Sequence, residues 1–402
     1  MPYTTLEKIY YKNRAEYEKE YAARLASPSC VKFDFTIHGH NAFFIVTPKI
    51  LDMTNKILVK NTDAFMIDLP ALALAQFMMK SLIDEIYQSL DIEHVHSTRR
   101  EISELLDNVG KKKQKRLSGM VDKYFMLINN EDIPLSTCIE IRKLYDDLCL
   151  SEVIEEDPTN KPDGKIFRRK EVFIEKKSRR IHSGSFPEHV IITEMDRALL
   201  ILHDESIALL IRVAVFHYLF AYIHPFYDGN GRMARFITSY MLSKKLGILI
   251  SVRISYTIKE NINLYYRMFK ETNERKNRGD LTEFIECFLL ILDESMDNLT
   301  RALKERRQKL TYFNDLLGKV LKDKQEFNFA YLILQFELFG ISGATRKQIN
   351  KMMSLGDYKI NKLLQEANIA KLIKTTKSGN KYTYSFNLDE LEKMASNETG
   401  IE

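Results

Sequence analysis

Hydrophobic residues at helical spacing dominate the middle of this chain of 402 residues. Two strongly apolar runs, Ile207 to Ile223 and Phe236 to Leu246, each have the length of a buried helix, and a polar segment separates them. Helical patterns also cover Leu69 to Leu90, Glu101 to Asp132 and Ser136 to Cys149. The pattern therefore predicts a mainly α-helical fold, with a polar loop held between two buried helices.

Strand patterns are confined to short segments. Near the N-terminus, Val31 to His38 and Ala42 to Val46 have strand-like sequences. Before the central helices, a strand is favoured at three consecutive residues, Val172, Phe173 and Ile174. A returning strand is expected at Arg180 to His182 after a turn at Lys176 to Ser178. We therefore expect a basic β-hairpin there, with a merely solvated hairpin as the alternative.

The last part of the chain has a different pattern, in which short helices precede a hairpin. Helices are predicted at Thr345 to Met353 and Tyr358 to Ala367, and strands at Leu372 to Thr376 and Lys381 to Phe386. This order resembles a winged helix-turn-helix. Its second helix and its hairpin carry the lysines Lys359, Lys362, Lys374, Lys377 and Lys381. Such a surface can meet DNA phosphates, or alternatively serve only protein contacts or a homodimer.

Composition excludes several classes of protein. Net charge is only +5, which does not by itself indicate a nucleic-acid binder. No apolar run reaches membrane-spanning length, and Met1 to Asn13 lacks the apolar core of a signal peptide. The four cysteines are scattered without CxxC spacing. We therefore expect a cytoplasmic protein with reduced thiols, without a membrane partner, a disulfide framework or a zinc site.

The polar loop between the two apolar runs reads His224-Pro225-Phe226-Tyr227-Asp228-Gly229-Asn230-Gly231-Arg232-Met233-Ala234-Arg235. Its glycines let a ligand approach the main chain closely. The first amides of the following helix have no intrahelical partner and attract negative charge. Amides of Gly229, Asn230 and Gly231 are therefore predicted to form an anion hole for phosphate.

The side chains of this loop suit the same ligand. Asp228 can hold Mg²⁺, which prefers one or two carboxylates plus phosphate oxygens. Arg232 and Arg235 lie three residues apart on one side of the helix and can bind phosphate oxygens. A neutral His224 can take a proton from a hydroxyl group. The combination predicts phosphoryl or nucleotidyl transfer.

Simpler interpretations exist for each part. A lone histidine before proline is usually a helix-end residue, and Asp-Gly-Asn-Gly is usually a turn. A zinc site from His224 and Asp228 is disfavoured because Pro225 and Gly229 break the helix that would align them. These readings lose force because all the positions occur together.

The loop resembles the signature of the Fic (filamentation induced by cyclic AMP) family, His-x-Phe-x-(Asp/Glu)-Gly-Asn-Gly-Arg-x-x-Arg, and every fixed position is present. The resemblance implies a protein adenylyltransferase that moves AMP from ATP to a Ser, Thr or Tyr hydroxyl of a protein, itself included. It implies His224 as general base, Asp228 as the Mg²⁺ ligand, and Phe226 as a buried anchor. Asn230 and the glycine amides would contact the α- and β-phosphates, and Arg232 and Arg235 the rest of the triphosphate.

A second resemblance concerns an upstream segment. Ser89 and Glu93 match the family's inhibitory motif, (Ser/Thr)-x-x-x-Glu-(Gly/Asn), except that His94 stands at the last position. In the self-inhibited class with this motif before the core, the glutamate pairs with the second signature arginine, here Arg235. The alternatives are that Glu93 is a solvated helix residue, or that Glu101, four residues after a serine, has the role.

Three further assignments rest on the same resemblance. The hairpin with Val172, Phe173, Ile174 and His182 is similar to the Fic flap, which docks target segments by main-chain pairing. Tyr265 and Tyr266 are similar to residues that close the adenine side of the site, although an ordinary helix face explains them too. Asn273 falls where some members contact adenine.

The expected architecture is a mainly α Fic-fold helical core with a β-hairpin flap and a C-terminal winged helix-turn-helix. The predicted parts are an N-terminal module (1–70), the core (71–299) with an inhibitory helix at about 80–95, a connecting helix (300–325), a winged helix-like domain (326–392) and a tail (393–402). Alternative functions are a Fic-type phosphotransferase, an enzyme that removes AMP, or a DNA-binding regulator with a nucleotide-sensing core.

Overall fold

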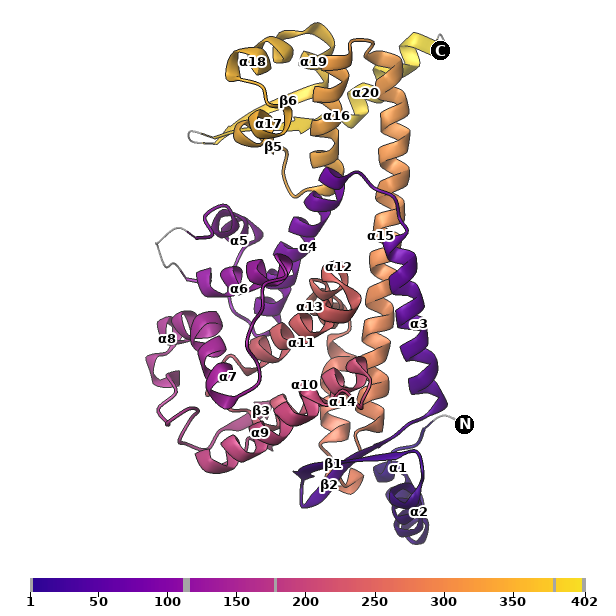
Figure 1. Ribbon diagram of the computed structural model, residues 1–402, viewed down its shortest axis with the longest axis vertical. Coiled ribbons are helices and arrows are strands. Elements are labelled where there is room, and N and C mark those ends of the chain that lie inside the picture. Colours follow the sequence, from indigo (N-terminus) through magenta and orange to yellow (C-terminus); the bar gives the residue numbers. More distant parts are fainter. Residues whose placement is uncertain (1–2, 111–115, 177–178, 379–380, 400–402) are drawn as a thin grey trace. The chain divides into compact units, whose positions relative to one another are not determined.

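The computed structural model describes residues 3–110, 116–176, 179–378 and 381–399 (Figure 1). Over these residues the chain is mainly helical, as the hydrophobic pattern predicts. It divides into two compact units, one of Met1–Asn61 with Leu82–Asp297, the other of Thr62–Ser81 with Asn298–Glu402. The loop from His224 to Arg235 lies in the first unit.

The first unit opens with two helices and a hairpin. Helices α1 (Leu6–Lys12) and α2 (Arg14–Ala26) precede the antiparallel strands β1 (Cys30–Ile37) and β2 (His40–Ile45). Both strands lie within two residues of the predicted positions. Asn13 begins α2, because its side-chain oxygen accepts hydrogen bonds from the amides of the first turn. Leu6, Tyr17 and Phe43 join these elements in one hydrophobic cluster.

The centre of this unit is a series of packed helices, α9 (Glu188–His203), α10 (Leu209–Ile223) and α11 (Asn230–Leu246). Their neighbouring positions can be followed in Figure 1. Helix α10 is apolar on almost every side and is buried accordingly. The polar loop therefore connects two helices that the surrounding protein holds in place.

Further elements lie wholly or partly in the first unit. They are α3 (Pro48–Phe65), α4 (Ala71–Ile92), α5 (Arg99–Leu106), α6 (Ser118–Ile128), α7 (Cys138–Tyr145), a π-helical turn (Asp146–Leu150), α8 (Ser151–Glu156), β3 (Phe173–Lys176), β4 (Arg179–Ser183), α12 (Ile248–Ser251), α13 (Ile254–Glu260) and α14 (Ile262–Thr272). Single-turn 3₁₀ helices occur at Pro158–Asn160 and Arg275–Asn277. Strands β3 and β4 pair antiparallel, and Val172 precedes the first of them.

The second unit contains α16 (Lys324–Phe339), β5 (Ala344–Thr345), α17 (Arg346–Met353), α18 (Asp357–Gln365), α19 (Ala367–Leu372), β6 (Ile373–Ser378), β7 (Lys381–Phe386) and α20 (Leu388–Thr399). Its antiparallel sheet has the order β5-β7-β6. The sequence predicts one helix from Tyr358 to Ala367, whereas the structure ends α18 at Gln365. The reason is Glu366, whose extended backbone (ψ 135°) interrupts the helix before α19 begins.

Helix α15 (Thr282–Val320) runs through the boundary predicted at residue 299. Its 39 residues contain no proline, so nothing in the sequence ends the helix earlier. Among the described residues, no helix combines the length and the apolar character that crossing a bilayer requires.

A buried carboxyl group anchors the end of α4 that leads to the site. Glu85 is fully buried and accepts hydrogen bonds from the Ser255 amide (2.7 Å) and hydroxyl (2.6 Å), at the start of α13. Burial raises the pKa of Glu85 to about 7, although the bonds from Ser255 and the charge of Arg235 oppose the rise. Glu85 therefore fixes α4, on which Ser89 lies one turn later and which Glu93 directly follows.

This pKa predicts how stability depends on pH. In the unfolded chain, Glu85 has a pKa near 4.5 and loses its proton above that pH, whereas in the folded protein Glu85 keeps its proton up to about pH 7. The free energy of unfolding therefore falls as the pH rises from 4.5 towards 7. Compared with Glu85→Gln, the wild type should lose about 3 kcal/mol of unfolding free energy between about pH 4.5 and 7. Urea unfolding at both pH values measures this, with exposed Glu104→Gln as the control. An equal pH dependence in wild type and Glu85→Gln would refute it.

Candidate active site

The candidate site is built on the turn between α10 and α11. His224 ends α10 in a left-handed conformation (φ 52°), and Gly229 begins α11 in another (φ 80°). Phe226, fully buried between them, stacks on Tyr145 at a centroid distance of 3.7 Å and meets Phe167 edge-on. The loop is thereby anchored through its middle, as predicted for Phe226.

Asn230 closes the loop with its side chain. Its Oδ1 accepts a hydrogen bond from the Phe226 amide (3.0 Å), and its Nδ2 donates to the Phe226 carbonyl (2.8 Å). Both ends of the carboxamide are thus bound to the loop itself. Any contact of Asn230 with a phosphate would therefore come most directly from its main-chain amide at the start of α11.

Arg168 supports the loop from outside, and sequence reasoning missed it. This fully buried guanidinium donates to the carbonyls of His224 (2.9 Å), Lys170 (2.6 Å), Ser185 (2.8 Å) and Ile223 (3.5 Å). It thereby joins the segments on either side of β3 and β4 to the end of α10. In the sequence it is one of several basic residues, and nothing distinguishes it from its exposed neighbours.

His224 is suited to act as a base. Burial lowers the pKa of His224 to about 4, and the nearby charges of Arg168 and His182 lower it further, against an opposing effect of Glu93. The imidazole is therefore neutral at neutral pH and can accept a proton.

Arg232 is buried and already paired on both sides. Its guanidinium forms ion pairs with Glu152 of α8 and with Asp228 (3.1 Å). Glu152 is itself buried, and the sequence offered no signal for it beyond an acidic helix. Glu152 and Asp228 thus share the buried guanidinium of Arg232 and fix it at the first turn of α11.

Asp228 has the character that a Mg²⁺ ligand needs when phosphate oxygens complete the shell. One oxygen accepts from the Gly229 amide (2.5 Å), and about a third of the side chain (36%) is exposed. Burial raises the pKa of Asp228, and the charge of Glu93 adds to this effect, whereas the Gly229 bond opposes it. Among the described residues no three His, Cys, Asp or Glu side chains gather as a metal group. A single carboxylate fits Mg²⁺ bound jointly with a nucleotide.

Arg235 meets Ser89 and Glu93. Its Nη1 donates to Glu93 (2.7 Å), its Nε to the Ser89 hydroxyl (3.1 Å) and its Nη2 to the Ser89 carbonyl (2.7 Å). Burial raises the pKa of Glu93, but the charge of Arg235 and its hydrogen bond lower this pKa more strongly. The pKa of Glu93 therefore lies below the usual value for a glutamate. Glu93 is therefore ionised at neutral pH.

The carboxylate of Glu93 also lies at the start of α11. A Cβ placed on Gly231 would lie 2.0 Å from Glu93 Oε1, so only glycine leaves room for this carboxylate. The same place, beside the first amides of the helix, is where the sequence predicts a phosphate. Glu101 lies instead on α5, where its amide bonds the capping hydroxyl of Thr98 (3.1 Å).

His94 occupies the position where the family motif has Gly or Asn. Its backbone is left-handed (φ 60°), and the Val95 amide closes the end of α4 on the Leu90 carbonyl (3.0 Å). Glycine and asparagine are the residues that adopt this conformation most readily, and histidine is among those that tolerate it. The exit of the helix therefore has the left-handed turn that glycine or asparagine would favour.

The residues predicted on the adenine side lie in different surroundings. Tyr265 is buried, and its hydroxyl bonds His217 Nε2 (2.8 Å). Tyr266 is 45% exposed. Asn273 bonds His182 Nδ1 (3.3 Å) and, through its Oδ1, His38 Nε2 (3.0 Å).

The hairpin residues lie next to the end of α10. His182 Nε2 donates to the Tyr222 carbonyl (2.6 Å), and the Gly184 amide donates to the carbonyl of Val172 (3.1 Å). Phe173 pairs with Ser183 and Ile174 with His182 across β3 and β4. His38 was not predicted, because its partners are more than 180 residues away in the sequence.

Known proteins resemble part of this chain. Residues 139–242 match the model of the Fic/DOC family. "Protein adenylyltransferase Fic" of Drosophila yakuba is 24% identical over 148 residues, which are 37% of this chain and 28% of that protein. This chain thus spans little more than a quarter of that relative's length.

Two solved structures are also similar. A Fic family protein from Desulfovibrio desulfuricans G20 matches with a TM-score of 0.50 at 18% identity, over 85% of this chain and 97% of that one. Fic-1 (residues 134–508) from C. elegans matches with a TM-score of 0.43 at 19% identity, over 64% and 75%. The loop from His224 to Arg235 lies within the part that matches the family, and residues 139–242 form a Fic/DOC family domain in this mainly helical protein.

Proposed function

We propose that this protein is a self-inhibited protein adenylyltransferase that moves AMP from ATP to a Ser, Thr or Tyr hydroxyl of a protein. The observation that carries the proposal is the convergence at the start of α11 of a neutral imidazole, a carboxylate, two buried arginines and the first amides of the helix. The "adenylyltransferase" in the name of the Drosophila yakuba relative supports the choice of AMP as the transferred group.

The geometry suggests how each residue acts. The target hydroxyl loses its proton to His224, its oxygen bonds the α-phosphorus, and the bond to the bridging oxygen breaks to release pyrophosphate. The amides of Asn230 and Gly231 would face the phosphates, together with that of Gly229 once it leaves Asp228, its partner in this structure. Arg232 and Arg235 would balance the phosphate charge. Mg²⁺ held by Asp228 would neutralise charge on the leaving pyrophosphate. Tyr265, Tyr266 and Asn273 form the adenine side, and β3 and β4 act as the flap for the target.

Self-inhibition follows from the double role of Arg235. While its guanidinium bonds Glu93, the γ-phosphate of ATP loses that partner. The carboxylate beside Gly231 also repels phosphate from the helix amides. ATP would then bind with its α-phosphate out of line with the attacking hydroxyl.

Glu93→Gly should therefore raise self-modification by about tenfold or more, because it removes a charge-assisted hydrogen bond that competes with phosphate. Intact-mass spectrometry after incubation with ATP and Mg²⁺ measures the product as a mass increase equal to AMP. Glu101→Gly, the rival glutamate, is the control and should behave as wild type. Unchanged modification in Glu93→Gly would refute the inhibitory role.

The same spectra discriminate the other chemistries. A mass increase equal to phosphate alone would indicate a phosphotransferase. Loss of AMP from a pre-modified target in wild type, but not in Glu93→Gly, would indicate that the enzyme also removes AMP.

His224→Ala in the Glu93→Gly background should lower transfer at least about 100-fold while ATP still binds, because only the proton acceptor is lost. With a pKa of about 4, the imidazole is unprotonated throughout neutral pH. The rate of the parent should therefore stay nearly level from about pH 8 to 6 and fall only in more acidic solution. Exposed His189→Ala is the control. Retained transfer in His224→Ala would exclude a base at this position.

A second activity is favoured by the C-terminal unit, in which Lys359, Lys362, Lys374 and Lys377 are all exposed. A winged helix with α18 as its reading helix would present these charges to DNA phosphates. The alternative is a protein contact or a homodimer through the same surface.

Duplex DNA should bind the full chain with strong salt dependence. Lys359→Ala with Lys362→Ala should reduce the slope of log affinity against log salt by about two, one for each lost phosphate contact. Fluorescence anisotropy of a labelled duplex measures the slope, and Lys56→Ala in the first unit is the control. Salt-independent or absent binding would leave protein contacts or a homodimer as the role of this surface. DNA binding retained in His224→Ala would separate the two activities.

A further inference from the structure

The loop that carries Asn273 depends on contacts from elsewhere in the first unit. We define it as residues 273–281, between α14 and α15, and call it the base-side loop. Two successive residues are left-handed, Arg278 (φ 50°) and Gly279 (φ 79°). This conformation is disfavoured for a residue with a side chain, so Arg278 must be held by its surroundings.

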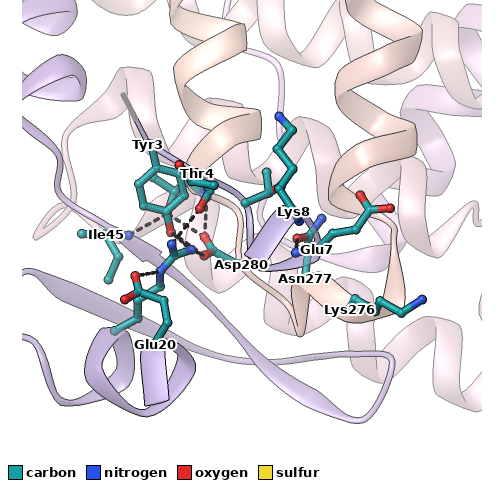
Figure 2. Close-up of polar contacts among 12 residues, drawn as sticks. Tyr3, Thr4, Glu7, Lys8, Glu20, Ile45, Lys276, Asn277 and Asp280 are labelled. Atoms are coloured by element: carbon teal, nitrogen blue, oxygen red, sulfur yellow. Dashed lines mark hydrogen bonds and ion pairs between the residues drawn. The ribbon is translucent and has the colours of Figure 1, made fainter. Parts of the chain in front are cut away.

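The N-terminal hairpin and helices supply main-chain contacts to this loop. The Phe43 amide donates to the Gly279 carbonyl (3.0 Å), and the Leu281 amide donates back to Phe43 (2.8 Å). The Glu7 amide donates to Asn277 Oδ1 (2.8 Å), as Figure 2 shows. The loop thus pairs with β2 at one isolated parallel bridge, between Asp280 and Phe43.

Charged and aromatic side chains hold the left-handed residue. Arg278 donates to both carboxylate oxygens of Glu18 (2.8 and 2.6 Å), and its guanidinium lies over the rings of Tyr17 (4.5 Å) and Tyr21 (4.7 Å). The Tyr17 hydroxyl donates to the Lys276 carbonyl (2.8 Å). Helix α2 therefore fixes both the backbone and the side chain at the strained position.

A buried ion pair completes the attachment. Arg24 Nη1 donates to Asp280 Oδ2 (3.0 Å), and both side chains are almost fully buried. Tyr3 also donates to Asp280, and Figure 2 shows Tyr3 and Asp280 directed towards each other. The other Asp280 oxygen accepts from the Thr282 amide (3.0 Å) and hydroxyl (2.6 Å). Breaking a buried ion pair of this kind leaves an uncompensated charge. We therefore expect α2 to stay bound to the base-side loop as long as the protein is folded.

The same hairpin reaches Asn273 directly. His38, at the turn between β1 and β2, uses Nε2 to bond both the carbonyl (2.9 Å) and the Oδ1 (3.0 Å) of Asn273. One N–H of the Asn273 carboxamide donates to His182, and the carboxamide oxygen accepts from His38. The two histidines thus orient the Asn273 carboxamide so that its second N–H can donate to a ligand.

We propose that residues 3–46 position the base-side loop and that His38, as a positioning residue, orients Asn273 for the adenine ring. This inference rests on the proposed function. It assigns to residues 3–46 the role of setting the affinity for the adenine base of ATP. Near the site, His38 and Phe35 of this segment contact Asn273 and Tyr222. We therefore expect the segment to act on base binding and not on the transfer step.

The test uses full-length Glu93→Gly protein as the parent, so that inhibition does not mask binding. His38→Ala should bind ATP about fivefold more weakly, as expected for one or two lost hydrogen bonds. Its discrimination between ATP and GTP should shrink, KM for ATP should rise, and kcat at saturating ATP should stay unchanged. Asp280→Asn should shift the same quantities in the same direction. Exposed His189→Ala is the control, and thermal midpoints identify variants that lose folding.

Calorimetric titration with ATP and with GTP decides the outcome. Unchanged ATP affinity in His38→Ala overturns the proposal, and so does an equal loss for ATP and GTP, since the effect would then not concern the base. A loss of kcat without a change in KM also overturns it. If the parent binds no ATP, the proposed function itself fails, and this result is recognised before any N-terminal variant is compared.

Discussion

The structure of the candidate site depends on one buried guanidinium. Arg235 is fully enclosed, and its three nitrogens are bonded to a carboxylate, a hydroxyl and a carbonyl on α4. A buried cation is tolerated only when such partners surround it, so Arg235 fixes the distance between α4 and α11. Glu85 secures α4 one turn earlier, at α13. The loop, the end of α4 and the start of α11 are therefore held together by the same buried contacts.

Three buried arginines serve the site in different ways. The charges of Arg235 and Arg232 are balanced by carboxylates, whereas the hydrogen bonds of Arg168 go to main-chain carbonyls. A guanidinium can act in both ways because it presents five donors in a planar fork. Under the proposed function, the two paired arginines exchange their carboxylates for phosphate. Arg168 instead donates to four carbonyls that belong to the loop and its neighbouring segments, so it holds the shape of the loop.

The sequence predicted the features that local pattern determines. The apolar runs before and after the loop indicated two buried helices, and the contiguous residues from His224 to Arg235 indicated the Fic/DOC family domain. The chemistry predicted from the same residues stays a prediction. Partners from distant segments could not be predicted in this way. Glu152, Arg168 and His38 reach the site only because of tertiary packing, and each looks like an ordinary surface residue in its local context. The break at Glu366 was missed because a single backbone angle there decides between one helix and two.

The left-handed backbone of His94 has a consequence for how the inhibitory motif is defined. The role of that position is to turn the chain out of α4 immediately after Glu93, which depends on a dihedral angle and not on a side chain. Any residue that reaches the angle at an acceptable free-energy cost preserves the geometry around Arg235. Under the proposed function, a motif written as a glutamate followed by a left-handed residue would include this chain, whereas a motif written as residue letters excludes it.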